Sequence, residues 1–139
     1  MKTGFFKQVN ESKTNGYISI SLYPSNNSFI SYEYKSLAPN WKLFENLTKK
    51  KISEKQFIDS YKEQLFYLNP KTVYDDLKSL VFGFEPIIMT NVSKKKFCHR
   101  HIVAEWLENE LGIVIEEYKY GKVIRSNGYM KKNTNPTLF

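Results

Sequence analysis

The segment from Pro86 to Gly112 constrains the fold more than any other part of the sequence. It begins with an apolar run, Pro86–Val92, which is too short for a helix and indicates a buried central strand. A polar, lysine-rich turn follows, and from Phe97 or Cys98 onward the pattern predicts a helix that ends at Gly112. The first N–H groups of a helix lack internal partners, so a strand that leads into a helix start commonly forms an anion site. We therefore predict an anion site at the start of this helix.

Strand and helix patterns alternate along the rest of the chain. Tyr17–Tyr23 alternates apolar and small polar residues with period 2, and Ile113–Tyr118 is another predicted strand. Helix starts are predicted at Ser53, which begins a capping box, and at the Asn69-Pro70 pair. Apolar residues at helical spacing support three helices: Trp41, Phe44 and Leu47; Phe57, Ile58, Tyr61, Leu65 and Leu68; Val73, Leu77, Leu80 and Val81. The alternation predicts an α/β fold, a small three-layer domain with a mostly parallel central sheet flanked by helices.

The length of 139 residues suits one domain that buries about two-thirds of its unfolded surface. Hydrophobic residues make up 41% of the chain, which is ample for a core. We expect a single α/β domain over residues 1–125, in which Phe5–Val9 is a further candidate for a short strand. Residues 126–139 are polar, basic and poor in aliphatic side chains, so we predict a flexible C-terminal tail, mobile or held only by a partner.

The formal net charge of +7 points to an anionic partner such as a nucleotide, nucleic acid or acidic protein. An equally weighted alternative is that the lysine-, asparagine- and isoleucine-rich composition reflects AT-rich coding.

The single cysteine permits no internal disulfide, which fits a reducing compartment. Neither a signal peptide nor a membrane span is apparent in the sequence. We therefore expect a cytoplasmic protein with no membrane partner.

The first turn of the predicted Cys98 helix carries the candidate site residues. The apolar positions from Ile102 to Leu111 define a buried stripe, and His99 falls near its middle. Arg100 lies at one edge of the stripe, and His101 is expected to point mostly to solvent. We predict that His99 and Arg100 line a pocket floor together with the strand end at Asn91. The alternative is that His99 is a buried structural histidine bonded to a backbone carbonyl.

Cys98 is a candidate nucleophile or redox-sensitive thiol. The helix dipole and the neighbouring cations, His99 among them, favour its thiolate form. The alternative is a small packing residue at a helix start. A metal site is not predicted, because His99 and His101 are two residues apart and diverge on a helix. No cofactor is predicted either.

Three consecutive lysines, Lys94, Lys95 and Lys96, precede this helix. Their position beside a helix N-terminus suits a phosphate clamp. As an isolated feature, such a charge run is equally typical of a solvated turn. Both interpretations stay open at this point.

Three motifs occur in order: Ser36-Leu-Ala-Pro-Asn40, Phe57-Ile-Asp-Ser-Tyr61-Lys-Glu-Gln-Leu65 and Phe97-Cys-His-Arg-His-Ile-Val-Ala-Glu-Trp-Leu107. Together they resemble the bacterial and phage family called domain of unknown function 488, over about residues 15–118. The resemblance implies a compact α/β fold and brings no established activity. Two positions depart from the family pattern: Ser21 and Leu22 stand where the family has an arginine, and Met89-Thr90-Asn91 replaces Cys-Tyr-Glu. These departures favour a degenerate or repurposed site.

The sequence thus leads to two classes of function, and it does not decide whether a reaction is catalysed. In the first, a phosphate-bearing ligand, a nucleotide or a nucleic-acid end, binds at the Cys98-His99-Arg100 helix start. Arg100, Asn91, Lys94, Lys95 and Lys96 would hold the ligand, with His99 as acid or base. In the second, the chain is a non-catalytic basic module for nucleic acid or an acidic protein. A thiol-based enzyme that uses Cys98 is a third possibility.

Overall fold

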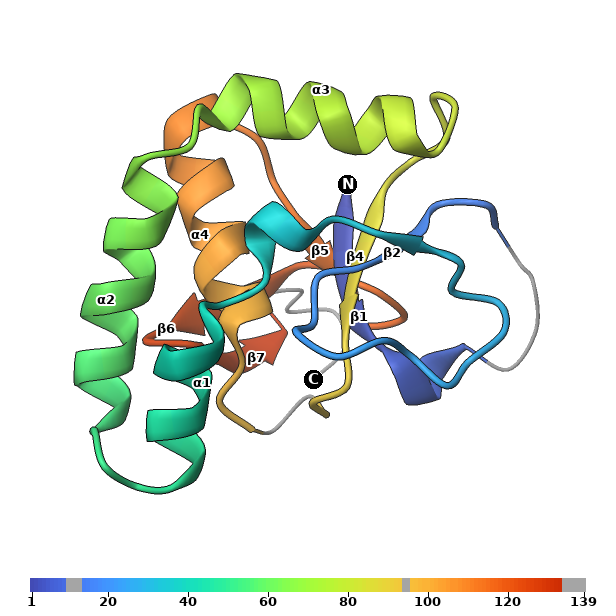
Figure 1. Cartoon of the computed structure of the whole chain (residues 1–139). Helices are drawn as coiled ribbons and strands as arrows, with labels where there is room; N and C mark the ends of the chain where they lie inside the picture. Colours follow the sequence, from blue (N-terminus) through green and yellow to red (C-terminus); the bar gives the residue numbers. More distant parts are fainter. Residues whose placement is uncertain (10–13, 94–95, 134–139) are drawn as a thin grey trace.

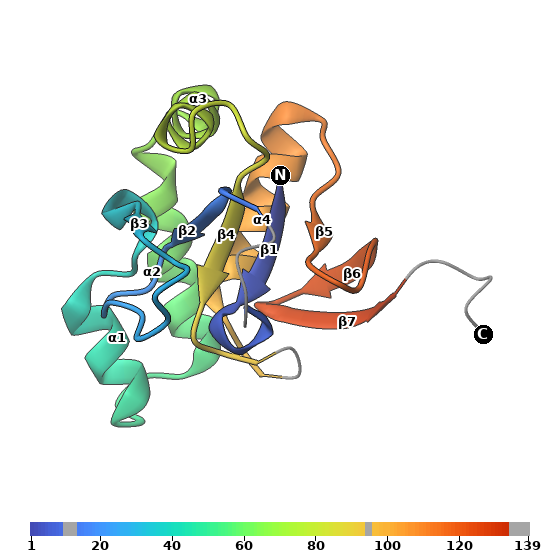
Figure 2. The same ribbon diagram turned by 90° about the vertical axis from the view of Figure 1, so that its right-hand side faces the viewer.

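The computed structural model describes residues 1–9, 14–93 and 96–133. Five strands form its sheet in the order β3-β2-β4-β1-β5 (Figures 1 and 2). Their bounds are Lys2–Phe5 (β1), Tyr17–Ser19 (β2), Tyr32–Glu33 (β3), Ile87–Thr90 (β4) and Glu116–Glu117 (β5). Neighbouring strands are parallel, and Ile88 of β4 lies opposite Thr3 of β1 and Ile18 of β2. The fully buried β4 is therefore the central strand that the apolar run predicted.

Local signals in the sequence place the helices correctly. Their bounds are Trp41–Thr48 (α1), Glu54–Phe66 (α2), Pro70–Leu80 (α3) and His99–Leu111 (α4). The Ser53 capping box forms, Asn69 caps α3, and α4 ends at Gly112 with a φ of 66°. Among the described helices, none combines the length and the apolar character that crossing a membrane requires.

The two faces of the sheet are covered differently. Ile18 and Ile88 point to the face that packs against α2, α3 and α4, where the larger hydrophobic cluster lies. Ile87 and Met89 point to the other face, which is covered by residues beyond β1 and before β3, including Val9 and Ile30. Adjacent residues of β4 thus serve opposite faces, as the period of a strand requires. The result is the expected three-layer α/β arrangement with a parallel sheet in the middle.

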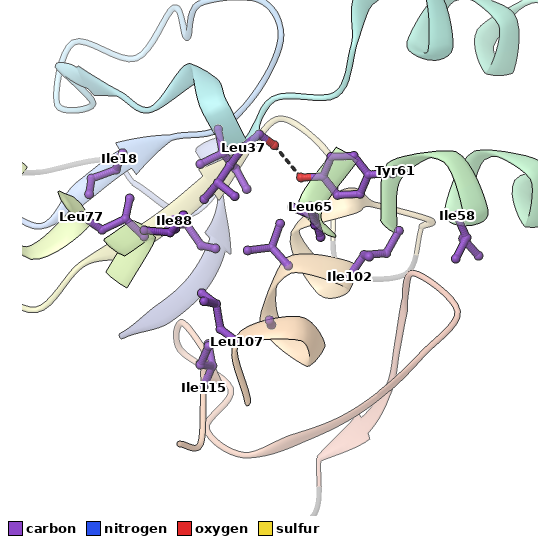
Figure 3. Packing of buried hydrophobic residues seen from close by; sticks show 14 of the residues in the cluster. Ile18, Leu37, Ile58, Tyr61, Leu65, Leu77, Ile88, Ile102, Leu107 and Ile115 are labelled. Carbon is purple, nitrogen blue, oxygen red and sulfur yellow. Dashed lines mark hydrogen bonds between the residues drawn. The ribbon is translucent and has the colours of Figure 1, made fainter. Parts of the chain in front are cut away.

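Tyr61 of α2 joins the helical layer to the polypeptide that precedes α1. Its ring is fully buried in the larger cluster, and its hydroxyl donates a hydrogen bond of 2.5 Å to the carbonyl of Leu37 (Figure 3). A buried hydroxyl needs such a partner, because leaving it unpaired costs about 1–3 kcal/mol. This bond fixes the Leu-Ala-Pro turn, which leads into α1, against the core.

An antiparallel hairpin follows the sheet. Its strands are β6 (Val123–Ser126) and β7 (Tyr129–Asn133), joined at Asn127 and Gly128, both with positive φ. In Figure 2 the hairpin lies beside β5, and the Tyr129 hydroxyl of β7 donates to Glu54 at the start of α2. The domain boundary expected at residue 125 falls inside β6, so residues 126–133 are part of the hairpin. The last part of the expected tail, 134–139, lies outside the described residues.

Several predicted strands have different bounds in the structure. The strand expected over Tyr17–Tyr23 ends at Ser19, and the one expected over Ile113–Tyr118 is limited to Glu116–Glu117. The strand candidate Phe5–Val9 is wrong: β1 ends at Phe5 and a short 3-10 helix follows. Ladder length depends on where the neighbouring strand runs, and a single-strand pattern does not contain that information.

Candidate functional site

A pocket of about 470 Å³ opens where β1, β2 and β4 end, beside the first residue of α4. We call it the strand-end pocket. Its lining residues are Phe6, Lys7, Val9, Ser21, Leu22, Tyr23, Pro24, Ser25, Asn26, Asn27, Pro39, Phe44, Asn91, Val92 and His99. The carboxyl ends of parallel strands are where open α/β sheets bind ligands. The volume lies in the range of small-molecule sites, about 300–1,000 Å³.

The charge and ring chemistry of the strand-end pocket favour an anion with an aromatic part. Lys7 and His99 are its titratable bases, and none of the described lining residues is acidic. The rings of Tyr23 and Phe44 meet edge to face, with centroids 6.1 Å apart. Tyr23 remains 65% exposed and so offers a stacking surface at the pocket mouth.

Several polar groups of the pocket wall are already committed to the protein. The Asn27 amide donates to the carbonyls of Phe6 and Val9, which ties the end of β1 to the loop after β2. The Ser25 hydroxyl accepts the Asn27 N–H at 2.9 Å. Lys35 donates to the carbonyls of both Ser21 and Leu22. These bonds hold the wall in shape and leave other groups to meet a ligand.

His99 lies between the pocket and the core. Its Nε2 is 2.8 Å from the carbonyl oxygen of Ile20, and its ring meets Tyr61 edge to face. A carbonyl only accepts, so Nε2 carries a proton. Nδ1 accepts in the neutral ring and, once it is also protonated, donates to the Cys98 thiolate. The sequence offered two interpretations, a histidine that lines a pocket and a buried histidine bonded to a carbonyl. Both descriptions apply, because this carbonyl-bonded histidine also lines the pocket with Asn91.

Cys98 is the N-cap residue of α4 and is 2% exposed. Burial raises the pKa of its thiol, but the hydrogen bond and charge of His99, the charge of Arg100 and the hydrogen bond with Thr90 together lower it to about 7. The Thr90 hydroxyl oxygen lies 3.1 Å from the sulfur. The thiol is therefore poised to ionise near neutrality, but it does not line the strand-end pocket.

Arg100 is fully buried, and its guanidinium is occupied by protein acceptors. It donates to Thr90 Oγ1 at 2.9 Å and to the Val92 carbonyl at 2.6 Å. It also forms a two-point ion pair with the buried Glu117, the shorter contact being 2.8 Å. Arg100 is not among the residues that line the strand-end pocket. Its charge lowers the pKa of the Cys98 thiol, and its hydrogen bonds fix the end of β4.

The expectation that His101 points to solvent is wrong. His101 is fully buried, and Arg125 of β6 donates to its Nδ1 at 3.0 Å. Burial, followed by the charges of Arg100, Arg125 and His99, lowers the pKa of His101 to about 2, so the ring is neutral. The helical wheel assigned this position to solvent because nothing in the periodicity of α4 reveals that the hairpin covers its outer face.

Sequence reasoning also missed the buried polar network that joins the hairpin to the sheet. Arg125 donates to the Thr3 hydroxyl and to the Ile115 carbonyl, both at 2.6 Å. Thr3 in turn donates to Glu117 at 2.6 Å. The available signal was the charge of Arg125 directly after the apolar pair Val123-Ile124, together with the acidic strand Glu116–Glu117.

The remaining predicted site residues lie in the loop between β4 and α4. Asn91 is exposed and lines the strand-end pocket, whereas Lys96 is exposed and does not line it. Lys94 and Lys95 lie outside the described residues. One donor of the helix start is already used, since the Cys98 N–H donates to the Gly128 carbonyl at 2.8 Å. Of the predicted residues, the structure thus brings Asn91 and His99 together at the pocket.

Within the described ranges, no cluster of three or more His, Cys, Asp or Glu residues is arranged to hold a metal ion. A search of curated proteins and a search of solved structures each found no significant match. A family model described as the active DUF488-N3 subclade matches residues 19–111, a stretch that runs from the end of β2 to the end of α4. The chain therefore belongs to the DUF488 family, as its Leu-Ala-Pro and Cys-His-Arg motifs suggested.

Proposed function

We propose that the chain binds a phosphate-bearing ligand, a nucleotide or a nucleic-acid end, in the strand-end pocket. The observation that carries the proposal is the pocket itself, which lies at the carboxyl ends of three parallel strands and next to the start of α4. Its basic side chains and the lack of acidic groups among its described lining residues favour an anion. The exposed ring of Tyr23 suits a planar base.

Each group has a separate role in this proposal. Lys7 and the Asn91 amide hold the ligand, and Lys96, exposed on the loop before α4, adds positive charge nearby. Arg100 does not touch the ligand but fixes the end of β4 through Thr90 and Val92. The sequence predicted that the Arg100 guanidinium binds the ligand directly. We instead assign it a supporting role, because its donors are bonded to buried protein acceptors.

The reactive candidates are His99 and Cys98. His99 faces the pocket with its Nε2 fixed, so Nδ1 is the nitrogen that is able to accept a proton. Cys98 lies directly before it, with a thiol pKa of about 7 that favours thiol chemistry. The matched subclade is described as active, and that description supports a working site rather than a degenerate one.

Calorimetric titration of the protein with nucleoside mono-, di- and triphosphates tests the proposal. We expect binding to wild type and an affinity about tenfold lower in Lys7→Ala, because the substitution removes a charged contact with the phosphate. Lys55→Ala is the matched control: it removes the same charge from α2, outside the strand-end pocket. No binding to wild type, or equal losses in both variants, would contradict the proposal.

A further inference from the structure

Ser21, two residues beyond β2, has a hydroxyl that no described residue pairs with. The residue is 7% exposed and lines the strand-end pocket. Its Oγ is shielded from solvent and has no hydrogen-bond partner among the described residues. Buried hydroxyls are nearly always paired in native proteins, so an unpaired one beside a cavity is a feature that needs a physical reason.

Ser21 lies in a buried part of the pocket wall. The neighbouring Ile20 carbonyl is bonded to His99, and Lys35 holds the Ser21 carbonyl. Ser21 and His99 are both buried, whereas Tyr23 is 65% exposed and Lys7 is exposed. The pocket therefore has a polar inner end next to the start of α4 and an aromatic, cationic mouth.

This polarity orients a ligand that has both a phosphate and a base. The positive end of the α4 dipole lies at the inner end, where negative charge is stabilised. The stacking surface of Tyr23 lies at the mouth, so the base faces outward. An internal phosphodiester continues into polymer on both sides, so a terminal phosphate reaches the buried inner end more easily.

We propose that the Ser21 hydroxyl donates a hydrogen bond to a terminal phosphate that enters the strand-end pocket ahead of its base. The assignment rests on the proposed function and narrows its substrate class to units with a phosphate monoester at one end. Rotation about χ1 turns the hydroxyl from its enclosed position toward the cavity, since serine has three staggered rotamers. This rotation leaves the bond from Lys35 to the Ser21 carbonyl unchanged.

The test compares Ser21→Ala with wild type by calorimetry. It uses four probes: adenosine monophosphate, adenosine, a 5′-phosphorylated dinucleotide and the same dinucleotide without its 5′-terminal phosphate. We expect Ser21→Ala to bind the monophosphate about tenfold more weakly or worse, since hydrogen bonds to charged groups are strong. Adenosine binding should be unchanged. The thermal midpoint of unfolding should not fall, because the hydroxyl bonds to none of the described residues. Ser60→Ala, which removes a hydroxyl from the exposed side of α2, is the control.

The outcomes separate this assignment from the proposed function. If wild type binds none of the phosphorylated probes, both are wrong. If wild type binds the monophosphate and Ser21→Ala binds it equally well, the strand-end pocket stands and the role of Ser21 is overturned. If Ser21→Ala loses the same factor of affinity for adenosine as for its monophosphate, that role is also overturned. Binding of the phosphorylated dinucleotide alongside the monophosphate identifies strand ends as ligands, and binding of the monophosphate alone identifies free nucleotides; either result supports the assignment.

Discussion

At the scale of single residues, the ionisation of Cys98 is set by its neighbours. Burial raises the pKa of the thiol, while His99, Arg100 and Thr90 lower it from 9.0 to about 7. The sequence contains one cysteine, so the ultraviolet absorbance of the thiolate reports on this residue alone. We expect a titration midpoint near pH 7 in the folded protein, and a higher midpoint in His99→Gln, which loses the hydrogen bond and the charge that favour the thiolate. A wild-type midpoint near 9 would contradict this account.

The same ionisation makes stability depend on pH. The folded state releases the Cys98 proton at lower pH than the unfolded chain does, so between about pH 7 and 9 the unfolded chain binds more protons and stability rises with pH. This contribution is complete above pH 9 and is lost as the pH falls through about 7. In urea unfolding, the difference in the free energy of unfolding between wild type and Cys98→Ser should therefore grow from pH 7 to pH 9, by up to about 3 kcal/mol. A deficit that stays constant from pH 7 to 9 is the opposing result.

The ion pair between Arg100 and Glu117 is a second residue-scale feature with a clear consequence. Both side chains are fully buried, so Glu117→Gln leaves the guanidinium charge without its counter-ion. We expect a loss of about 3–5 kcal/mol in the free energy of unfolding, measured with urea. Asp59→Asn is the control: it breaks the exposed pair with Lys55 and should change stability by less than about 0.5 kcal/mol. Similar effects of the two substitutions would show that the buried pair is not structural.

Residue positions were predicted from the sequence where one element decides them. His99 turns inward and Asn91 follows the central strand, because each position depends only on helix periodicity or on where an apolar run ends. The surroundings of Arg100 and His101 were not predictable in this way. Their partners, Glu117 and Arg125, come from elements later in the chain, and helix periodicity does not identify a partner from another element.

At the scale of elements, the hairpin supports the start of α4 on the side away from the strand-end pocket. Gly128 has a φ of +82°, and its carbonyl accepts the N–H of Cys98. A Cβ at this position would lie 2.6 Å from Phe97 Cδ2 and closer still to Cε2. Gly128→Ala should therefore displace the hairpin and destabilise the protein by about 1–3 kcal/mol, measured by urea unfolding. The Cys98 amide should also exchange its hydrogen faster.

Asn127→Gly is the matched control for this prediction. Asn127 already has a φ of 53° and is exposed, so a glycine adopts its conformation without a clash. Stability should change by only a few tenths of a kcal/mol. If Gly128→Ala is equally mild, the close approach to Phe97 does not hold the hairpin in place.

Elements were predictable from sequence to the extent that local signals define them. The caps at Ser53, Asn69 and Gly112 are local, and they place the helix ends well. The hairpin had a local signal too, since Asn-Gly between two short runs is a strong hairpin turn. The polar composition of residues 126–139 outweighed that signal and favoured a tail instead. Strand lengths, in contrast, depend on partners that lie far away in the chain.

At the scale of the whole molecule, the order of the strands creates the pocket. The chain runs from β1 past the place of β4 to β2 and β3, then returns to insert β4 between β1 and β2. The strand ends that meet at the pocket are thus distant in the sequence: β1 ends at Phe5, β2 at Ser19 and β4 at Thr90. Alternating strand and helix patterns predict the α/β class, but they do not give this order.

The two proposed classes of function differ in how the charge of the whole molecule acts on binding. Formal net charge is +7, and Lys50 and Lys51 are exposed in the turn after α1, outside the strand-end pocket. A nucleotide held in the pocket contacts few phosphates, so its affinity should fall by less than about tenfold between 50 and 200 mM salt, whereas a surface that tracks six or more phosphates loses about a thousandfold. Calorimetry with adenosine monophosphate and with a single-stranded oligonucleotide measures both slopes. We expect the shallow slope for the nucleotide, and the double variant Lys50→Ala, Lys51→Ala should leave its affinity unchanged. A steep slope, or a loss of nucleotide binding in that variant, would favour the basic module over the pocket.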